Sequence, residues 1–484
     1  MAWKPSQACG LLAAVALVAA CAGAAPTPQS TKVTPPPAPA LTPTSAPAPR
    51  AVIIDTDLGA DDLAALAVLL RDPALDVRAI TVAGTGLTHC GPGLRTLRNL
   101  LADFGTPTVP IGCGREIGGA GAYPFPDEWR MASDAAFGIT FAPVPATEAG
   151  GEAAAVIAEA IGGSPAPPLV VALGPWTNLA DTLAADPALA DRISGIHAMG
   201  GTLDAPGNVW AGGRALDIRV EFNFAADPPA VAAVLATDVP VTLVPLDATD
   251  DVAVTPDFAA DLESDHGAAG ANLVFELYAR SPALAGAGQF LWDQTAALAL
   301  LAPDVATWED VRVGVTTTRP DSGGIIRDPA GRPVRAAVAA DPPRIRSALL
   351  AALRRGAPRA HPFAPVGTLA VTWDGRACAA GSVPVRPGLH EVRLENRTSA
   401  PASVTIGGAR PPRTWADLVA LLPDYDATQA PPDWVIGIAA VSAEANAVGR
   451  AYVDVPAGTF GPVCATGELP SLRIIPGAPF DVAP

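Results

Sequence analysis

The sequence predicts an α/β domain with a mainly parallel, Rossmann-like sheet covered by helices on both faces, followed by a smaller β-sandwich. Between residues 51 and 358, short apolar runs of strand length alternate with longer helical segments. These runs are continuous rather than alternating, which is typical of parallel strands buried on both faces. From residue 366 onward the pattern changes to short β-like runs separated by glycine, proline and aspartate, which favours a sandwich.

The elements of the first region follow one another as strand and helix. The predicted pairs are 51–54 with 61–70, 79–83 with 94–104, and 168–173 with a helix that begins near Asn178. A further strand is predicted at 239–245, and the arginine-rich helix 343–356 closes the region. Because ligands of such sheets gather at the carboxyl ends of the strands, we expect the functional site there.

The second region, 366–484, follows a proline-rich linker at 359–365. Its predicted strands are 368–372, 391–395, 403–406, 435–441, 451–455 and 471–475, with one helix at 414–422. The stretch 456–464 weakly resembles cupredoxin-like domains. A blue-copper site needs two histidines and usually a methionine, but only His390 lies in this region, so we interpret the resemblance as structural.

The N-terminal segment is interpreted as an export signal rather than as part of the fold. Lys4 precedes an apolar run at 11–20, and small residues lead into Cys21, a pattern that resembles the lipobox of bacterial lipoproteins. The alternative is an ordinary signal peptide cleaved near Ala25. Residues 22–50 are rich in proline, threonine and alanine and predict a disordered stalk. We therefore expect an exported chain with a lipoprotein-type signal at 1–21, anchored to a bacterial membrane through a lipid on Cys21.

Charge and lysine content exclude several classes of function. The 484 residues include 31 basic and 48 acidic side chains, a net charge of −17, which disfavours nucleic acid as a partner. The only lysines are Lys4 and Lys32, both before the first predicted domain. A P-loop and Schiff-base catalysis both need a lysine, so both are excluded.

The cysteines fit an exported protein. Four of them lie in the predicted domains, namely Cys90, Cys113, Cys378 and Cys464. An even number predicts disulfides, with three connectivities open; pairing within each domain, Cys90 with Cys113 and Cys378 with Cys464, is the simplest.

A cluster of carboxylates marks the end of the first strand. Asp55, Asp57, Asp61 and Asp62 fall within eight residues, where an apolar strand stops and a helix starts. A hard divalent cation would offset their repulsion, and oxygen-only ligation favours calcium over zinc. Gly59 would permit the tight turn that this requires. The alternative is an acidic helix cap that only complements the helix dipole.

This cluster, Asp55-Thr56-Asp57-Leu58-Gly59-Ala60-Asp61-Asp62, resembles the Asp-x-Asp-Pro-Gly-x-Asp-Asp signature of the inosine/uridine-preferring nucleoside hydrolases, with Leu58 in place of the proline. Further blocks follow in the order of that family. They are Leu173-Gly174-Pro175-Trp176-Thr177-Asn178-Leu179-Ala180, Met199-Gly200-Gly201, Gly207-Asn208, Glu221-Phe222-Asn223, Asp227-Pro228 and Trp292-Asp293.

The resemblance implies a fold, an activity and a set of site residues. It implies one Ca²⁺ held by Asp57, Asp62, Asp293 and the main-chain carbonyl of Leu173. It implies that Asp57 is the general base for a metal-bound water, with Asp55 supporting it from behind. The ribose hydroxyls would be bound by Asp61, Asn208, Glu221, Asn223 and Asp293.

Departures from the family pattern bear on the leaving base. Where many pyrimidine-accepting members carry a histidine as leaving-group acid, this chain has Trp292, as purine-preferring members do; the alternative is a core aromatic. Thr85 replaces an asparagine of the family. His89, in the loop pinned by Cys90, is a candidate replacement acid, although a surface histidine is the commoner case. Trp129 is a candidate second stacking wall, and His197 is interpreted as a core residue of a strand.

These observations together predict a calcium-dependent nucleoside N-ribohydrolase that favours purine nucleosides. One alternative is a non-catalytic surface lipoprotein that binds ribosides or sugars through the same calcium pocket. Another is a hydrolase of a different riboside, such as nicotinamide riboside. The expected partner is a small-molecule nucleoside, and assembly into a homo-oligomer is left open.

Overall fold

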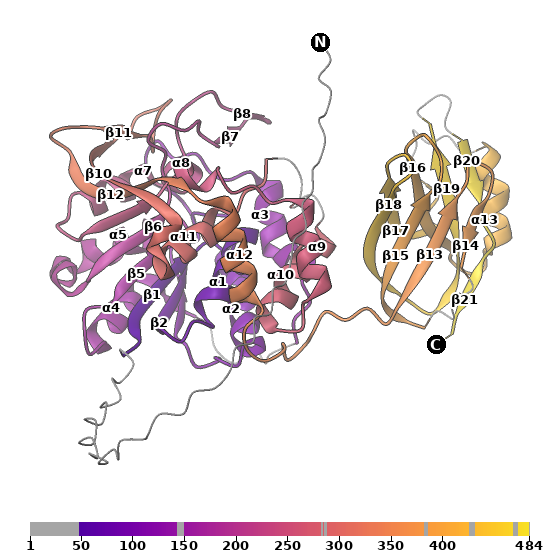
Figure 1. The fold of residues 1–484 in the computed structure, drawn as a ribbon, viewed down its shortest axis with the longest axis horizontal. Helices are drawn as coiled ribbons and strands as arrows, with labels where there is room; N and C mark the ends of the chain where they lie inside the picture. Colours follow the sequence, from indigo (N-terminus) through magenta and orange to yellow (C-terminus); the bar gives the residue numbers. More distant parts are fainter. Residues whose placement is uncertain are drawn as a thin grey trace, which may run out of the picture. The chain divides into compact units, whose positions relative to one another are not determined.

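The computed structural model describes residues 48–142, 150–281, 284, 288–381, 386–424, 431–467 and 473–483. Its centre is a ten-stranded sheet in the order β11-β10-β12-β9-β6-β5-β1-β2-β3-β4 (Figure 1). The strands are β1 Arg50–Thr56, β2 Leu75–Val82, β3 Ile111–Cys113, β4 Gly151–Glu152, β5 Leu169–Ala172, β6 Gly195–Met199, β9 Val241–Val244, β10 Ala306–Val315, β11 Ile325–Arg327 and β12 Arg332–Ala340. The sequence prediction of a mainly parallel sheet is confirmed.

Strands β1, β2, β3, β4, β5, β6, β9 and β12 pair in parallel, and β10 joins antiparallel to β12 and β11. The sequence did not lead us to predict this antiparallel edge. Strand β10 alternates exposed and partly buried residues because only one of its faces meets the core. The continuous apolar runs on which the prediction rests are absent from this strand.

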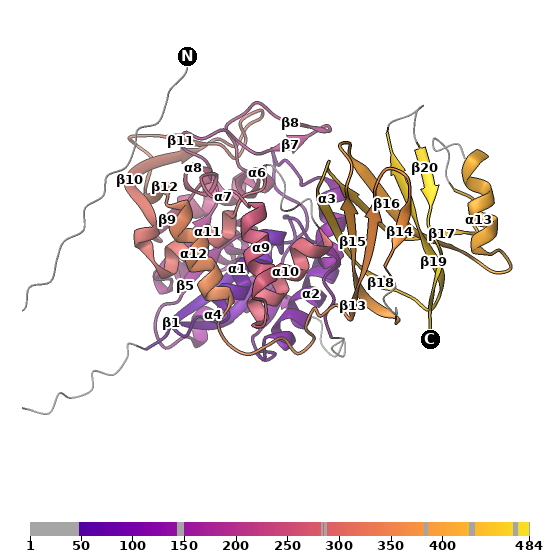
Figure 2. The same cartoon turned by 45° about the vertical axis from the view of Figure 1, so that its right-hand side comes forward.

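Helices cover the two faces of the sheet in separate layers (Figure 2). One layer contains α1 Ala60–Leu69, α10 Ala269–Arg280, α11 Trp292–Leu301 and α12 Pro342–Leu353. The other contains α4 Ala153–Gly163, α5 Thr177–Ala185 and α7 Pro228–Leu235. Each layer has its own hydrophobic cluster, with Leu63 and Leu273 in the first and Ile157 and Val231 in the second. The central strands are thereby buried from both sides, as their composition predicts.

The remaining helices lie at the edges of these layers or in connections. They are α2 Cys90–Asp103, α3 Asp127–Asp134, α6 Phe222–Ala226, α8 Leu246–Thr249 and α9 Pro256–Ser264. Cys90, at the start of α2, forms a disulfide with Cys113 at the end of β3, so one of the predicted pairs is confirmed.

The C-terminal region consists of two further sheets, mostly antiparallel, ordered β14-β13-β15-β18 and β17-β16-β19-β20, with β21 paired to β19. Its elements are β13 Gly367–Trp373, β14 Cys378–Ala380, β15 Gly388–Asn396, β16 Ala402–Ala409, α13 Trp415–Leu421, β17 Val435–Ala443, β18 Val448–Val455, β19 Gly458–Thr466, β20 Arg473–Pro476 and β21 Phe480–Val482. The second predicted disulfide, Cys378–Cys464, joins β14 to β19 and is confirmed. His390 is buried and bonds through Nδ1 to the carbonyl oxygen of Gly388.

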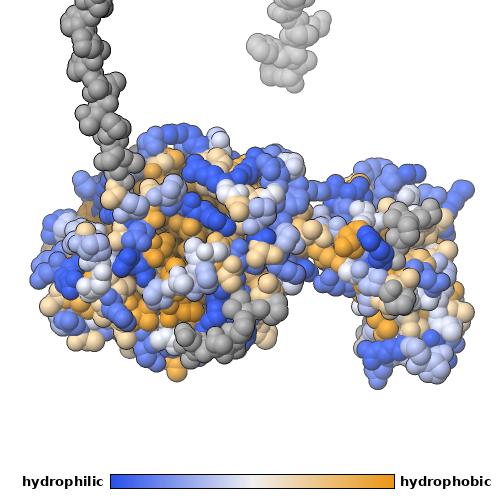
Figure 3. Space-filling model, turned by 90° about the horizontal axis from the view of Figure 1, so that it is seen from below, coloured by the Kyte–Doolittle hydropathy of each residue, from blue (hydrophilic) through white to orange (hydrophobic). Residues whose placement is uncertain are grey.

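Figure 3 shows one face on which hydrophobic residues fill a hollow in the α/β region and hydrophilic residues surround it. No helix of the described ranges is both long enough and apolar enough to cross a membrane. The predicted export signal at 1–21, and the predicted stalk up to residue 47, lie outside the described residues.

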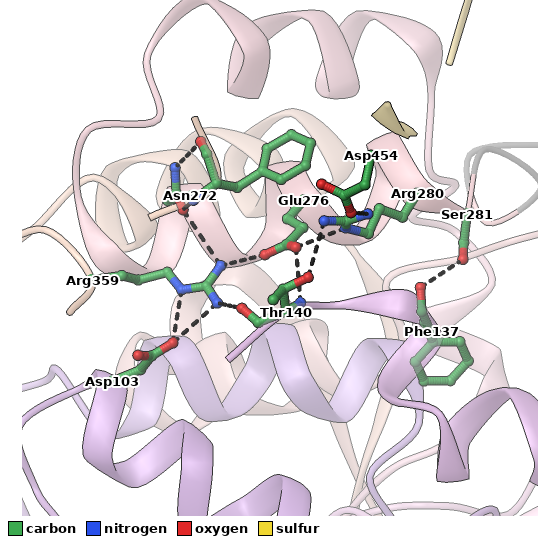
Figure 4. Close-up of polar contacts among 10 residues, drawn as sticks. Asp103, Phe137, Thr140, Asn272, Glu276, Arg280, Ser281, Arg359 and Asp454 are labelled. Atoms are coloured by element: carbon green, nitrogen blue, oxygen red, sulfur yellow. Dashed lines mark hydrogen bonds and ion pairs between the residues drawn. The ribbon is translucent and has the colours of Figure 1, made fainter. Parts of the chain in front are cut away.

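A buried arginine fixes the segment that follows α12. The guanidinium of Arg359, 3% exposed, donates to the carboxylates of Asp103 and Glu276 and to the carbonyl oxygen of Thr140 (Figure 4). The N···O distances are 3.0 Å to Asp103 and 2.6 Å to Glu276. Asn272 fixes Phe363 in turn, because the backbone N–H of Phe363 donates to Oδ1 of Asn272. Part of the predicted linker 359–365 is therefore anchored to the α/β region.

Replacing Arg359 should destabilise the protein strongly. Arg359→Met leaves the buried Asp103 without its cation and removes one of the two arginines that pair with Glu276, the other being Arg280. Breaking a buried pair of this kind typically costs about 3–5 kcal/mol. Chemical denaturation followed by circular dichroism would measure the change. The matched control is Arg344→Met, which removes an exposed arginine paired to Asp304 and should leave the unfolding midpoint nearly unchanged. Equal effects of the two substitutions would contradict this assignment.

Candidate active site

The turn after β1 folds a carboxylate back onto its own backbone. Leu58 adopts a positive φ of 58°, which turns the chain sharply between Asp57 and Gly59. The carboxylate of Asp62, in the first turn of α1, accepts hydrogen bonds from the backbone N–H groups of Asp57 and Gly59 and from the Thr56 hydroxyl. These hydrogen bonds close the turn at the carboxyl end of β1, which is where the sequence predicts the functional site.

A cavity of about 590 Å³ opens over this turn. It is lined by ten of the predicted site residues, Asp57, Asp61, Asp62, Trp129, Leu173, Asn208, Glu221, Asn223, Trp292 and Asp293. They come from the ends of β1 and β5, from the starts of α1, α6 and α11, and from α3. Residues separated by more than 230 positions in the sequence therefore meet at one edge of the sheet.

Three of the carboxylates are close enough to share an ion. Oxygen atoms of Asp61, Asp62 and Asp293 all lie within 4.8 Å of one another. Asp293 is buried, and its Oδ1 has no hydrogen-bond partner among the described residues. Leaving such an acceptor unpaired is costly, so a ligand for it is expected. The all-oxygen donor set fits a hard divalent cation better than zinc.

The pKa values of these carboxyl groups show the cost of placing them so close together. Withdrawal from water, together with neighbouring carboxylates, raises the pKa of Asp61 to about 7 and that of Asp62 to about 6. The same two causes, with Asp62 as the nearest negative neighbour, raise the pKa values of Asp57 and Asp293 well above their ordinary range. A bound cation would reverse these shifts by stabilising the ionised forms.

Asp57 is held from behind by small residues. Its Oδ2 accepts from the backbone N–H of Leu87 at 3.1 Å. A Cβ on Gly86 would lie 2.3 Å from Asp57 Oδ2, and one on Gly174 would lie 2.9 Å from its backbone nitrogen. Both positions therefore require glycine. Asp55 lies behind this layer, where its Oδ1 accepts from Thr81 and Asn178.

The predicted ribose-binding residues are fixed by backbone groups. Glu221 caps α6 and accepts from the N–H groups of Gly201, Asn223 and Phe224, and burial raises its pKa to about 7. The amide of Asn223 donates to the carbonyl oxygen of Leu173 at 2.8 Å. Asn208 accepts from the N–H of Phe222 through Oδ1, which leaves its amide nitrogen free to donate. Their cavity-facing atoms are thus set before any ligand binds.

Aromatic side chains form the other wall of the cavity. Trp129 contacts Phe222 and Trp210, with ring centroids 5.5 and 6.5 Å apart, and Phe125 stacks on Phe222 at 4.4 Å. Trp292 lines the cavity and donates from Nε1 to Asp250 at 2.9 Å. A planar ring bound in the cavity could stack on these aromatic side chains.

Two predicted features of the loop after β2 lie elsewhere. His89 is not among the residues that line the cavity; it precedes α2, and its Nδ1 is paired with Asp134 at 2.8 Å. The structure therefore does not place it with the other site residues. Thr85 is buried, and its hydroxyl is hydrogen-bonded to that of Thr177 at 2.8 Å.

Sequence reasoning missed several cavity residues. Trp210 belongs to the hairpin of β7 Trp210–Ala211 and β8 Arg214–Ala215, which lies between Asn208 and Glu221 in the chain. Trp210 could have been predicted as a cavity residue from the sequence, because it lies only two positions after the predicted site residue Asn208. Phe125 and Leu87 carry no chemical signature and could be found only through their neighbours in space.

Comparisons with known proteins agree with this geometry. A family model described as inosine-uridine preferring nucleoside hydrolase matches residues 52–347. The pyrimidine-specific ribonucleoside hydrolase RihA of Salmonella paratyphi B is 31% identical over 280 residues, which cover 55% of this chain and 84% of the relative. The non-specific ribonucleoside hydrolase RihC of Escherichia coli O9:H4 is 30% identical, with 60% of this chain and 93% of the relative covered.

A solved structure supports the fold. The purine-preferring ribonucleoside hydrolase from Gardnerella vaginalis superposes with a TM-score of 0.54 at 23% identity, covering 63% of this chain and 98% of that one. The part of this chain that matches is the region that carries the sheet and the cavity. The chain therefore belongs to the inosine-uridine preferring nucleoside hydrolase family and is a nucleoside N-ribohydrolase.

Proposed function

We propose that this enzyme hydrolyses the N-glycosidic bond of purine ribonucleosides in a calcium-dependent reaction that releases ribose and the free base. The observation that carries the proposal is the meeting of two unlike surfaces in one cavity. Oxygen ligands of Asp57, Asp61, Asp62 and Asp293 line one part, and aromatic rings line another. A ribonucleoside has the same division between a hydroxyl-rich sugar and a flat base.

Asp57, Asp62, Asp293 and the Leu173 carbonyl would hold the calcium ion, and Asp61 lies close enough to join them. Bound there, the ion would acidify a water molecule and order the ribose hydroxyls. Asp57 accepts a proton from the attacking water through its carboxylate, which the Leu87 N–H orients. Glu221 and Asn223 bind the ribose hydroxyls as acceptor and donor, with Asn208 donating from its amide.

The carboxylates also act on the sugar itself. Departure of the base leaves positive charge on the ribose ring, as in other glycosidic cleavages. Asp57, Glu221 and Asp293 are buried acidic groups around the same cavity, and their ionised forms stabilise that charge. Because these groups are fixed before substrate binds, little reorganisation is needed in the transition state.

The aromatic wall is the basis for proposing purine bases. Trp129, Trp210 and Trp292 all line the cavity, and a two-ring base offers such side chains more area for stacking than a one-ring base does. The two curated relatives described above are a pyrimidine-specific and a non-specific enzyme, whereas the Gardnerella vaginalis enzyme is purine-preferring. Base preference therefore has to be measured for this chain, and nicotinamide riboside is included as the alternative riboside.

Ribose release from inosine, guanosine, uridine and nicotinamide riboside should be fastest with the two purine nucleosides. A calcium chelator should abolish turnover, and added Ca²⁺ should restore it. Asp57→Asn should lower kcat by about 10²–10⁴-fold, the usual contribution of a general base. The exposed Asp127→Asn on α3 is the matched control and should retain full activity. Chelator-resistant turnover, or an active Asp57→Asn enzyme, would contradict the mechanism.

Removing Trp210 should weaken purine binding more than pyrimidine binding. Stacking of a base on an aromatic side chain is worth about 1–3 kcal/mol, so Trp210→Ala should raise KM for inosine roughly tenfold. The smaller ring of uridine should lose less. Steady-state kinetics would measure both, with Trp434→Ala in the C-terminal region as the control. Equal changes for inosine and uridine would rule out this role for Trp210.

Metal-free protein should lose stability as the pH rises from about 4 to about 7. In that range the folded state keeps protons on Asp55, Asp61 and Glu221, whose pKa values lie near 7, while the unfolded chain has lost them. Stability falls wherever the folded state binds more protons, so the fall should end once the pH exceeds these values.

Thermal unfolding in a chelator and in Ca²⁺, at pH 5 and pH 8, would test this. The ion should raise Tm more at pH 8, where the ionised carboxylates repel one another without it. Asp293→Asn should reduce this effect of Ca²⁺. A Ca²⁺-induced increase in Tm that is the same at both pH values would argue against a cation site at these carboxylates.

A further inference from the structure

A second, smaller cavity lies at the opposite end of the sheet from the active site. Its volume is about 140 Å³, and its lining includes Arg50, His197, Trp308 and Arg335. Arg50 is the first residue of β1, whereas Asp57 follows the last residue of the same strand (Figure 1). A space of this size suits a small ion rather than a nucleoside, since sites for drug-sized ligands measure roughly 300–1,000 Å³.

Both arginines of this cavity lack an acidic partner. Although the chain carries a net charge of −17, neither Arg50 nor Arg335 forms an ion pair with a described residue, unlike Arg327 and Arg344, for example. Asp310 stands opposite Arg335 in the register of β10 and β12, and no hydrogen bond joins their side chains. The two guanidinium groups therefore remain available to an anion.

Trp308 positions one of these cations. The guanidinium carbon of Arg335 lies 4.5 Å from the centroid of the Trp308 ring, and the indole itself is fixed by donating to the carbonyl oxygen of Pro303. A cation–π contact uses the attraction between the positive charge and the ring. It consumes no N–H group, so the donors of Arg335 stay free.

His197 also lines this cavity and has one ring nitrogen without a partner among the described residues. The side chain is 4% exposed, and its Nε2 is 2.8 Å from the carbonyl oxygen of Ala296. A carbonyl only accepts, so Nε2 carries the proton and Nδ1 presents a lone pair. Burial, together with the charges of Arg50 and Arg335, lowers the pKa of His197 to about 4, so the ring is neutral at physiological pH. No described residue bonds to Nδ1.

We infer that this cavity binds inorganic phosphate as its hydrogen-phosphate dianion. The two arginines donate to the anionic oxygens, and Nδ1 of His197 accepts from the remaining P–OH group. This pattern selects against dianions of similar size that carry no proton, such as sulfate. The sequence predicted His197 to be a core residue of a strand, and the structure confirms this: it is buried in β6 and also lines this cavity.

Calorimetric titration of the full-length protein at pH 8 would test the inference with three dianions. Phosphate should bind with a 1:1 stoichiometry. Sulfate and methyl phosphate, which lack a P–OH or equivalent donor at that pH, should bind roughly tenfold more weakly or not at all, since an unpaired buried acceptor is costly. Equal binding of phosphate and methyl phosphate would overturn the role of His197.

Variants locate the binding site. Arg335→Gln and Arg50→Gln lie at the surface and should each weaken phosphate binding roughly tenfold or more, while ribose release from inosine is unchanged. His197→Phe should remove the preference for phosphate over sulfate. If that buried substitution prevents folding, the two arginine variants still decide the question. Wild-type phosphate affinity in both arginine variants, or no phosphate binding by the wild-type chain, would refute the site.

Discussion

Repulsion among buried carboxylates is the constraint on which the active site depends. Asp57, Asp62 and Asp293 are withdrawn from water at one end of the sheet, and burial together with repulsion from neighbouring carboxylates raises the pKa of each carboxyl group. Folding supplies part of the compensation through backbone N–H groups at the start of α1 and through the Thr56 hydroxyl. A divalent cation would supply the rest. The same groups are then available to stabilise positive charge on the sugar.

This constraint also explains the backbone around the site. The carboxylates can lie this close together only because some neighbouring positions have no side chain. Gly86 and Gly174, beside Asp57, are two such positions, since a Cβ at either one would clash with Asp57. The two hydrophobic layers on either side of the sheet hold the strand ends in register, so the geometry does not depend on the ligand. The buried ion pairs of Arg359 extend this rigidity to the segment after α12.

Most of the fold was predictable because continuous apolar strands and alternating helices carry a strong signal. The antiparallel strand β10 and its neighbour β11 were not, since β10 has no such run. In the site, charged and amide residues such as Asp57 and Asn223 stand out by chemistry and spacing. Leu87 and Phe125 have no chemical signature in the sequence, so their place in the cavity could not be predicted. The prediction that His89 belongs to the site was also misleading, because its hydrogen-bond partner, Asp134, is distant in sequence.

The hairpin that carries Trp210 has a consequence for how specificity can change. Its stem is closed by hydrogen bonds from the N–H of Asn208 to Val220 and from that of Leu216 to Val209. The loop beyond that stem can therefore be lengthened, shortened or exchanged while Asn208 and Glu221 keep their places. Trp210, one of the three proposed base contacts, can thus be exchanged separately from the proposed sugar contacts, whereas Trp129 and Trp292 belong to helices α3 and α11.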